Sequence, residues 1–468
     1  MGPGSIYSHG PIYSHIFSKL TKIDITMSPA IIKSFMPLFK KERKERVLVI
    51  GLDGVPYSLL LELAQKGIMP TTSKLIDSGY IQRMKASLPE ISAVSWTNFM
   101  TGTNPGTHGI FGFTDFKKNS YDLCFPNFLD LKKETFWDKL GDQRKKCIII
   151  NQPSTYPARK INGILISGFV AIELSKAVYP PSFKAPLERV GYEIDIDTQK
   201  SAENTEFLWK DLAKTLSARL NAFNLFWKED WDYFEFVITG TDRLHHFQWD
   251  AYEDESHVYH KNFLDYYSQI DRVIDEIVTS FRKLTDNDKG LYLLSDHGFA
   301  QIEQEVYLNA WLEEQGYLKF NNPSPESLAE ISPSSRAFVM EPNRIYLNLK
   351  EKFLKGCVEQ SEKKALKEEI SKKLDKLEYK GKKVVRCVFD AEEIYSGPYL
   401  AEGPDLIVLS ECGYDMKGSV KKKEVFGRSK LQGMHTWDDA FFLSKKEQRQ
   451  DLSISDLAKI ILDDFSRK

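Results

Sequence analysis

Six short apolar runs recur along the chain, separated by longer stretches with the residue pattern of helices. The runs cover residues 46–52, 147–150, 163–166, 234–238, 291–294 and 406–409. Runs that are apolar at nearly every position are typical of strands buried on both faces of a parallel sheet. Stretches such as 206–227 and 259–284 are long enough to cross back between such strands. The pattern therefore predicts an α/β fold with a mostly parallel sheet and helices on both faces.

Residues 301–430 differ from the rest of the chain. They contain a Pro- and Ser-rich stretch (322–335), a strand-like run (344–349) and a helix rich in Lys and Glu (359–377). We interpret this region as an inserted α+β cap or lid that includes some strands of the core, because the run 406–409 lies within it. The predicted organisation is a tail, a catalytic core in two pieces and the insertion: 1–45, 46–300 with 431–468, and 301–430.

The first 45 residues do not resemble a folded element. Residues 1–26 repeat an Ile-Tyr-Ser-His tetrapeptide and contain no long apolar segment, so they do not match a secretory signal, and Met27 is an alternative start. Residues 31–46 mix apolar side chains with a basic run (Lys40, Lys41, Arg43, Lys44 and Arg46), which is compatible with weak peripheral contact with an anionic membrane. We favour a solvated lead-in to the first strand. No run of about 18 apolar residues exists, so we expect no transmembrane helix.

Charge and cysteine content narrow the class of protein. Lys and Arg number 64 and Asp and Glu number 66, for a net charge of −2. A near-neutral balance argues against a nucleic-acid partner, which usually requires a strongly basic surface. The five cysteines are widely spaced and form no CxxC pair, so they predict neither a disulfide framework nor a thiolate zinc site. We expect reduced thiols and a cytoplasmic protein.

Carboxylate and imidazole side chains follow the predicted strands or lie in loops. The set is Asp53, Asp242, His246, Asp296, His297 and His435. Asp242 and His246 are four residues apart, so one helical turn points both side chains at the same place. Gly298 permits the chain to turn sharply after Asp296 and His297. A lone Asp after a strand is more often a helix cap, but the ordered set is what a divalent metal requires.

Ser92 begins a helix-like segment that ends near Gly102. A hydroxyl at a helix N-terminus lies among free backbone N–H groups, where a phosphate is stabilised. Metal coordination would lower the pKa of this hydroxyl and make it an attacking nucleophile. The alternative is that Ser92 only caps the helix.

These residues resemble the motifs of the alkaline phosphatase superfamily, and within it the type I phosphodiesterase/nucleotide pyrophosphatase family. The resemblance runs from about residue 46 to 445 and excludes the tail. Its motifs are Val-Ile-Gly-Leu-Asp-Gly at 49–54, the segment 92–102 continuing to 110, Asp-Arg-Leu-His-His at 242–246, Ser-Asp-His-Gly at 295–298 and Gly-Met-His at 433–435.

The resemblance implies an alkaline-phosphatase-like core and an enzyme that hydrolyses phosphoester bonds with two divalent metal ions. One ion would be bound by Asp53, Asp296 and His297, with Ser92 facing it. The other would be bound by Asp242, His246 and His435. Zinc is usual in this branch, and manganese occurs in some relatives. The resemblance further implies that Ser92 attacks phosphorus and forms a covalent phosphoseryl intermediate on a small-molecule substrate.

Some features depart from the family or stay open. Relatives that act on nucleotides often have an Asn where this chain has Phe113, which weakens the case for a nucleotide substrate. Arg243 and His245 flank ligand residues and are candidates for contacting the substrate phosphate, with structural support as the alternative. A phosphomonoesterase, a phosphomutase-type relative and a non-catalytic binding protein on this fold are the other functions considered. The physiological substrate and the oligomeric state are left open.

Overall fold

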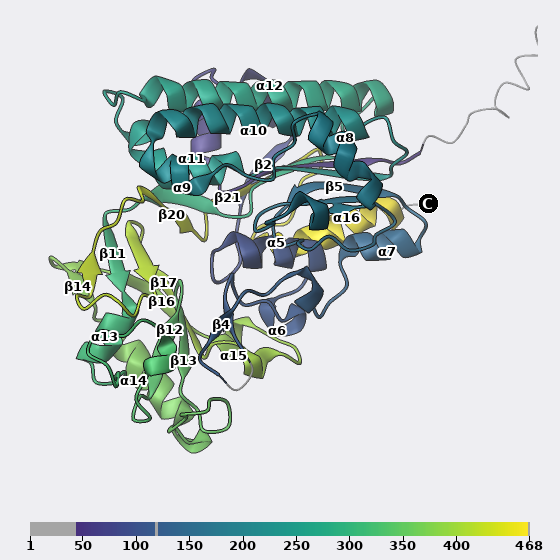
Figure 1. Cartoon of the computed structure of the whole chain (residues 1–468). Coiled ribbons are helices and arrows are strands. Elements are labelled where there is room, and N and C mark those ends of the chain that lie inside the picture. Colours follow the sequence, from purple (N-terminus) through teal and green to yellow (C-terminus); the bar gives the residue numbers. More distant parts are fainter. Residues whose placement is uncertain (1–43, 118–119, 467–468) are drawn as a thin grey trace, which may run out of the picture. The chain divides into compact units, whose positions relative to one another are not determined.

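An eight-stranded sheet organises the part of the chain that the computed structural model describes, residues 44–117 and 120–466 (Figure 1). The strand order is β2-β21-β9-β1-β8-β5-β6-β7. Five adjacent strands are parallel: β9 (Leu291–Leu294), β1 (Val47–Leu52), β8 (Tyr233–Ile238), β5 (Cys147–Gln152) and β6 (Gly163–Ser167). The other three strands pair antiparallel with their neighbours: β2 (Tyr80–Met84) with β21 (Ala440–Ser444), β21 with β9, and β7 (Val178–Tyr179) with β6. The predicted mostly parallel sheet is confirmed.

The central strands are apolar at nearly every position, and successive side chains of a strand point to opposite sides, so both faces of the sheet are apolar. In β1, Val47 and Val49 belong to one hydrophobic cluster, and Leu48 and Ile50 belong to the other. Every residue of β1 is buried, which explains its continuous apolar run.

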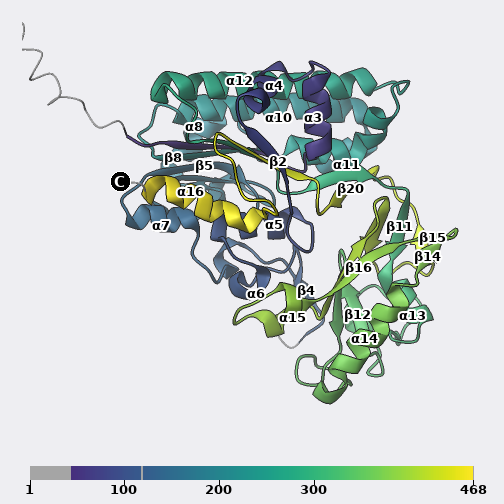
Figure 2. The same cartoon turned by 180° about the vertical axis from the view of Figure 1, so that it is seen from behind.

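Helices cover both faces, as predicted (Figure 2). On the face of Val47 lie α5 (Ser92–Thr101), α7 (Phe136–Asp142) and α16 (Leu457–Ser466). The other face is covered by α3 (Tyr57–Gln65), α4 (Pro70–Asp77), α8 (Lys184–Arg189), α10 (Thr205–Phe226), α11 (Gly240–Glu253) and α12 (His260–Thr285). The helices α10 and α12 correspond to the predicted stretches 206–227 and 259–284. Short helices α6 (Pro105–His108) and α9 (Thr198–Glu203) complete this region.

Residues 301–430, which we call the inserted lobe, form small sheets of their own. A four-stranded sheet has the order β12 (Ala337–Met340), β13 (Arg344–Leu347), β17 (Leu406–Ser410) and β16 (Val385–Asp390). A three-stranded sheet contains β18 (Tyr414–Lys417), β11 (Gln304–Tyr307) and β19 (Phe426–Gly427). The remaining elements are α13 (Leu308–Glu314), α14 (Lys363–Leu374), α15 (Ala391–Ile394), β14 (Glu378–Tyr379) and β15 (Lys382–Lys383).

One part of the predicted organisation is wrong. The run 406–409 was expected among the core strands, but it forms β17 in the antiparallel sheet of the inserted lobe. Leu406 and Val408 pack into the hydrophobic core of the lobe, whereas Ile407 packs against Phe111 and Tyr395 on the opposite face. Because both faces of β17 are buried, its sequence has the same continuous apolar character as a parallel strand.

The chain enters the inserted lobe through β10 (Gly298–Gln301) and leaves it through β20 (Gly433–Thr436), which pair with each other antiparallel. A further ribbon joins β3 (Asp115–Phe116) to β4 (Leu123–Cys124). Nearly all of the predicted tail, 1–45, and of the segment 31–46 lies outside the described residues. Among the described helices, none combines the length and the apolar character that crossing a membrane requires.

Candidate active site

Adjacent parallel strands bring the predicted ligands together. Asp53 follows β1 directly, Asp242 lies in the first turn of α11 after β8, and Asp296 and His297 follow β9. Because β9, β1 and β8 are neighbours, their carboxyl ends meet at one edge of the sheet. The pairing of β10 with β20 places His435 opposite Phe299, and the His435 ring stacks on His297 with centroids 3.7 Å apart.

The first group of candidate ligands is Asp53, Asp296 and His297. The His297 Nε2 atom lies 3.6 Å from Asp53 Oδ1 and 3.4 Å from Asp296 Oδ2. The backbone N–H of Gly54 donates to Asp296 Oδ1, whereas Asp296 Oδ2 is buried without a hydrogen-bond partner. Gly54 has a φ of +65°, and a Cβ there would lie 3.0 Å from the His297 ring. Glycine at this turn therefore lets the backbone approach both ligands.

The second group is Asp242, His246 and His435. The Asp242 Oδ1 atom lies 3.4 Å from His246 Nε2 and 3.2 Å from His435 Nε2, and the two Nε2 atoms are 3.1 Å apart. Asp242 Oδ1 is also 3.9 Å from His297 Nε2, so the two groups are contiguous. The structure thus brings together all six side chains that the sequence singled out.

Backbone carbonyls fix the ring orientation of all three histidines. The pairs are His297 Nδ1 with Gly298 O at 3.0 Å, His246 Nδ1 with Gly433 O at 3.1 Å, and His435 Nδ1 with Glu90 O at 2.9 Å. A carbonyl oxygen only accepts, so Nδ1 holds the proton of the neutral ring and Nε2 keeps its lone pair. The Nε2 lone pairs therefore face the carboxylates, which is the arrangement of metal-ligating histidines.

The electrostatics of the cluster also fit divalent cations. Burial, together with repulsion from Asp296 and Asp242, raises the pKa of Asp53 well above its usual range, and burial raises the pKa of Asp296 to about 7. Burial alone would raise the pKa of Asp242, but His246, His435 and Arg243 outweigh it and hold that pKa low. Burial lowers the pKa of His297 to about 4. A bound cation would offset this carboxylate repulsion and the contact between the Nε2 lone pairs.

Ser92 lies beside the first group of candidate ligands. Its hydroxyl donates to Asp53 Oδ1 over 3.3 Å and lies 3.1 Å from His297 Nε2. Ile91 occupies the N-cap position of α5, and Ser92 is the first helical residue. The hydroxyl therefore faces the candidate ligands instead of capping the helix. The Trp96 ring of α5 packs directly on Gly51 of β1, where a Cβ would lie only 2.6 Å from the ring. This close contact holds α5 against the sheet.

Arg243 lies beside the cluster, but its guanidinium is bonded to protein carboxylates. Nε and one terminal nitrogen donate to Asp195 Oδ2 at 3.0 and 2.8 Å, and the other terminal nitrogen donates to Asp242 Oδ2 at 3.1 Å. These bonds direct the Oδ1 atom of Asp242 toward the histidines. These contacts match a structural role for Arg243, the alternative to a contact with the substrate phosphate.

The structure does not bring His245 to the site. Its Nδ1 atom lies 2.9 Å from Gly54 O and its Nε2 atom 2.7 Å from the Tyr267 hydroxyl, and the side chain is fully buried. On α11, consecutive residues point about 100° apart, so His245 faces the helices while His246 faces the cluster. The expected contact between His245 and a substrate phosphate is therefore not possible in this arrangement.

Two residues that support the site were not predicted from the sequence. Asp195 fixes Arg243 but lies 48 residues away in sequence, so no local pattern connects them. Glu90 is buried, and its backbone carbonyl binds His435. A lone acidic residue two positions before Ser92 was a signal that could have drawn attention to Glu90.

Aromatic side chains border the site near the start of α5. Phe113, the residue at the position where relatives often have Asn, packs edge-on against Phe169 with centroids 5.4 Å apart. The Arg243 guanidinium lies 4.1 Å from the centroid of the Phe169 ring. Phe113 and Val170 also border a small crevice together with Ala93, the neighbour of Ser92. This side of the site is apolar.

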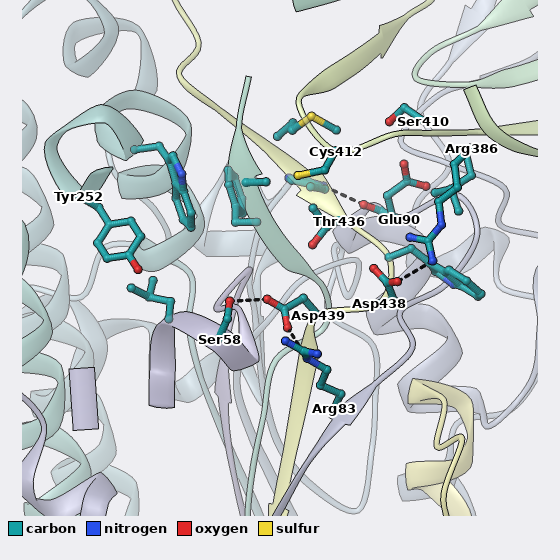
Figure 3. A pocket seen from close by; sticks show the side chains of 18 of the residues that line it. Ser58, Arg83, Glu90, Tyr252, Arg386, Ser410, Cys412, Thr436, Asp438 and Asp439 are labelled. Atoms are coloured by element: carbon teal, nitrogen blue, oxygen red, sulfur yellow. Dashed lines mark hydrogen bonds and ion pairs between the residues drawn. The ribbon is translucent and has the colours of Figure 1, made fainter. Parts of the chain in front are cut away.

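A cavity of about 410 Å³ adjoins the site at His435 (Figure 3). Its wall combines aromatic residues with charged residues of both signs. Arg386 pairs with Asp438 at 2.8 Å and Arg83 with Asp439 at 2.9 Å, so both arginines are neutralised within the wall. The Glu90 side chain lies on the same wall.

The sequence profile of type I phosphodiesterases/nucleotide pyrophosphatases matches residues 47–438. The chain belongs to this family. The match spans most of the chain and includes every motif that indicated the resemblance. A type I phosphodiesterase/nucleotide pyrophosphatase is a phosphoester hydrolase, so this chain is an enzyme of that class. None of the curated proteins searched matches the sequence.

Solved structures share the fold of this family member at low sequence identity. Phosphonoacetate hydrolase from Sinorhizobium meliloti 1021, solved with phosphonoacetate, is 14% identical with a TM-score of 0.60, over 90% of this chain and 96% of that one. Alkaline phosphatase PafA is 12% identical with a TM-score of 0.56, over 91% and 96%. Murine ectonucleotide pyrophosphatase/phosphodiesterase 5, with AMP, is 11% identical with a TM-score of 0.52, over 91% and 96%. These similarities establish the alkaline-phosphatase-like fold.

Proposed function

We propose that the chain is a two-metal phosphodiesterase in which Ser92 is the nucleophile. The observation that carries this proposal is the position of the Ser92 hydroxyl, within 3.3 Å of Asp53 Oδ1 and 3.1 Å of His297 Nε2. Among the described residues, no other side-chain hydroxyl contacts both a carboxylate and an imidazole of the cluster. Its place at the start of α5 also lets the phosphoryl group approach a helix N-terminus.

Asp53, Asp296 and His297 would hold one metal ion, and Asp242, His246 and His435 the other. Three imidazole and three carboxylate donors favour zinc, with manganese as the second choice. When bound, two such ions supply positive charge for the phosphoryl oxygens and lower the pKa of hydroxyl groups nearby.

The chemistry assigned to Ser92 has two steps. In the first, a bond forms between Ser92 Oγ and phosphorus while the ester P–O bond breaks, and the leaving group departs as an alcohol after taking up a proton. In the second, a water oxygen attacks phosphorus, the bond from Ser92 to phosphorus breaks, and the hydroxyl is restored. Asp53 accepts the hydrogen bond of the Ser92 hydroxyl and orients it before the first step.

The apolar side of the site favours a phosphodiester over a phosphomonoester. A monoester has one more charged oxygen than a diester, and it requires a cationic partner there. Arg243 is bonded to two carboxylates, and Phe113 and Phe169 present apolar edges. The second ester substituent of a diester matches these side chains better. The predicted cytoplasmic location remains part of this proposal.

Replacing the nucleophile tests the proposal. We expect Ser92→Ala to lower kcat for bis(p-nitrophenyl) phosphate by at least about 10³-fold, because no covalent intermediate can form. Metal content, measured by elemental analysis, should stay near two ions per chain. Ser217→Ala removes an exposed hydroxyl on α10 and serves as the matched control. Turnover by the Ser92 variant at the wild-type rate would reject Ser92 as nucleophile.

Substrate comparison and metal removal test the other parts. We expect faster hydrolysis of bis(p-nitrophenyl) phosphate than of p-nitrophenyl phosphate; the reverse order would indicate a phosphomonoesterase. Chelation should abolish activity, and added Zn²⁺ or Mn²⁺ should restore it. Full activity in metal-free protein would reject the two-metal scheme. If the metal-loaded protein hydrolysed neither substrate, a binding protein would be indicated instead.

A further inference from the structure

The segment that precedes Ser92 is held from outside the core, by the inserted lobe. The Tyr395 hydroxyl donates to the backbone carbonyl of Leu88 at 2.6 Å. The Asn343 Nδ2 group donates to both carboxylate oxygens of Glu90, at 3.3 and 3.2 Å. Glu90 and Asn343 are both buried, so these bonds are shielded from water. Two side chains of the lobe thus fix residues that lie within four positions of the proposed nucleophile.

Glu90 also contacts the second group of ligands. Its backbone carbonyl accepts the Nδ1 proton of His435 at 2.9 Å, and this bond sets the orientation of the His435 ring. Glu90 lies on the wall of the cavity beside Thr436, the residue after His435 (Figure 3). Movement of Glu90 would therefore displace His435 on one side and the start of α5 on the other.

The backbone of Asn343 is bonded to the sheet of the lobe. The backbone carbonyl of Asn343 accepts the N–H of Val408 at 3.1 Å, which ties it to β17 in the sheet of the lobe. The next residue, Arg344, is buried and donates to the carbonyl of Thr114 at 3.0 Å and to its hydroxyl at 3.2 Å. Consecutive residues of the lobe therefore bind the segment before α5 and the segment that carries Phe113.

We propose that Asn343 and Glu90 form a positioning pair through which the inserted lobe fixes both Ser92 and His435. The inference rests on the proposed function, because it assigns the pair to the reaction of Ser92. Neither residue needs to touch the substrate. Loss of the Asn343 side chain leaves a buried carboxylate without its donor, so Glu90 and the segment around it move to find another partner.

The expected consequences differ between the two groups of ligands. Mutation of a residue that orients a metal-ligating histidine typically lowers metal affinity by about 10- to 100-fold. His435 belongs to one group, whereas Asp53, Asp296 and His297 have no contact with the pair. Displacement of Ser92 lowers kcat more than KM, because the apolar side that holds the substrate is unchanged.

The test compares Asn343→Ala and Glu90→Ala with a matched control. Asn309→Ala removes a buried asparagine whose bonds, to Val339 and Gly418, lie wholly within the lobe. Metal-free protein is titrated with Zn²⁺, and kcat and KM are measured after reloading. We expect both test variants to bind one of two Zn²⁺ equivalents about 10-fold more weakly and to lose about 10-fold in kcat. The control should keep both affinities, even if its thermal stability falls.

Glu90→Gln keeps an acceptor oxygen for Asn343, so it should restore kcat and Zn²⁺ affinity to within about threefold of wild type. Wild-type affinity and kcat in Asn343→Ala would overturn the inference, and so would equal losses in Asn309→Ala. If wild-type protein binds neither Zn²⁺ nor Mn²⁺, the proposed function fails. The pair is then judged from the ¹⁵N shifts of the His435 ring in metal-free protein, which Asn343→Ala should change and Asn309→Ala should not.

Discussion

The core and the inserted lobe contribute to the site in different ways. All six candidate ligands and Ser92 come from segments at the ends of core strands or from α5, α11 and β20, and none comes from 301–430 among the described residues. The lobe contributes side chains that bind the loops of the core: Asn343, Arg344 and Tyr395. Parallel topology therefore gathers the reactive groups, and the antiparallel insertion holds the loops on which they depend.

The core and the inserted lobe have different hydrophobic clusters, and both regions contribute to the contacts at their boundary. The hydrophobic cluster of the lobe is formed mainly by β11–β13, α13, α14 and β17, and it also buries Tyr121 of the core, with Phe116 packed against it. A small separate cluster, with Phe111 from the core and Tyr395 and Ile407 from the lobe, joins the two regions. Apolar contacts of Phe116, Tyr121 and Phe111 therefore join the two regions, together with the polar contacts at this boundary. Because the candidate ligands all lie in the core, changes in each region should have separable effects.

The largest effect should come from the core ligands. We expect Asp296→Asn to lower kcat/KM by more than about 10³-fold and to reduce metal content, because it removes a carboxylate whose Oδ2 atom is buried without another partner. Elemental analysis and steady-state kinetics measure this change. Asp77→Asn, on an exposed position of α4, is the control. Full metal content with full activity would show that Asp296 is not a ligand.

A smaller effect should follow from disturbing the boundary without touching a ligand. A Cβ on Gly112 would lie 2.6–2.7 Å from the Arg344 guanidinium, which contacts Thr114. We expect Gly112→Ala to push Arg344 away and to lower kcat/KM for a diester about tenfold, with metal content unchanged. Unchanged kinetics would mean that the lobe does not influence the Phe113 side of the site.

A third change tests the buried core of the sheet away from the site. Glu235 on β8 is fully buried, and burial raises its pKa to about 8. The folded protein therefore holds this proton while the unfolded chain releases it near pH 4.5, so stability falls as pH rises between these values, by up to about 1.4 kcal/mol per unit. We expect Glu235→Gln to raise Tm relative to wild type, increasingly from pH 5 to pH 8. A constant difference across this range would contradict the shift.

The smallest effect should come from the outer surface of the lobe. Lys372 and Glu368 on α14 form an exposed pair at 3.8 Å. Exposed pairs contribute little, so Glu368→Ala should change the free energy of unfolding by less than about 0.5 kcal/mol and leave kcat/KM unchanged. Denaturant unfolding and kinetics measure both. A large loss of activity would show that the outer surface of the lobe also takes part in catalysis.

The sequence by itself determined the core architecture and the reactive residues. Continuous apolar runs such as that of β1 are required wherever both faces of a strand are covered, so they predict the parallel sheet directly. Polar residues at the ends of such strands, with Asp242 and His246 one helical turn apart, predict convergence because adjacent parallel strands end at the same edge. The order of these motifs was enough to indicate the family.

Only the tertiary structure decided the contacts that depend on long-range packing. The strand β17 looks like a core strand in sequence, because burial on two faces leaves the same pattern whichever sheet it joins. His245 lies next to a ligand in sequence, but the rotation of α11 turns it toward Tyr267. Asn343 and Glu90 are 253 residues apart, and a hydrogen bond between such residues leaves no periodic or local signal. Side-chain partnership across domains is set by the folded geometry alone, which is why the role of the lobe emerged only from the structure.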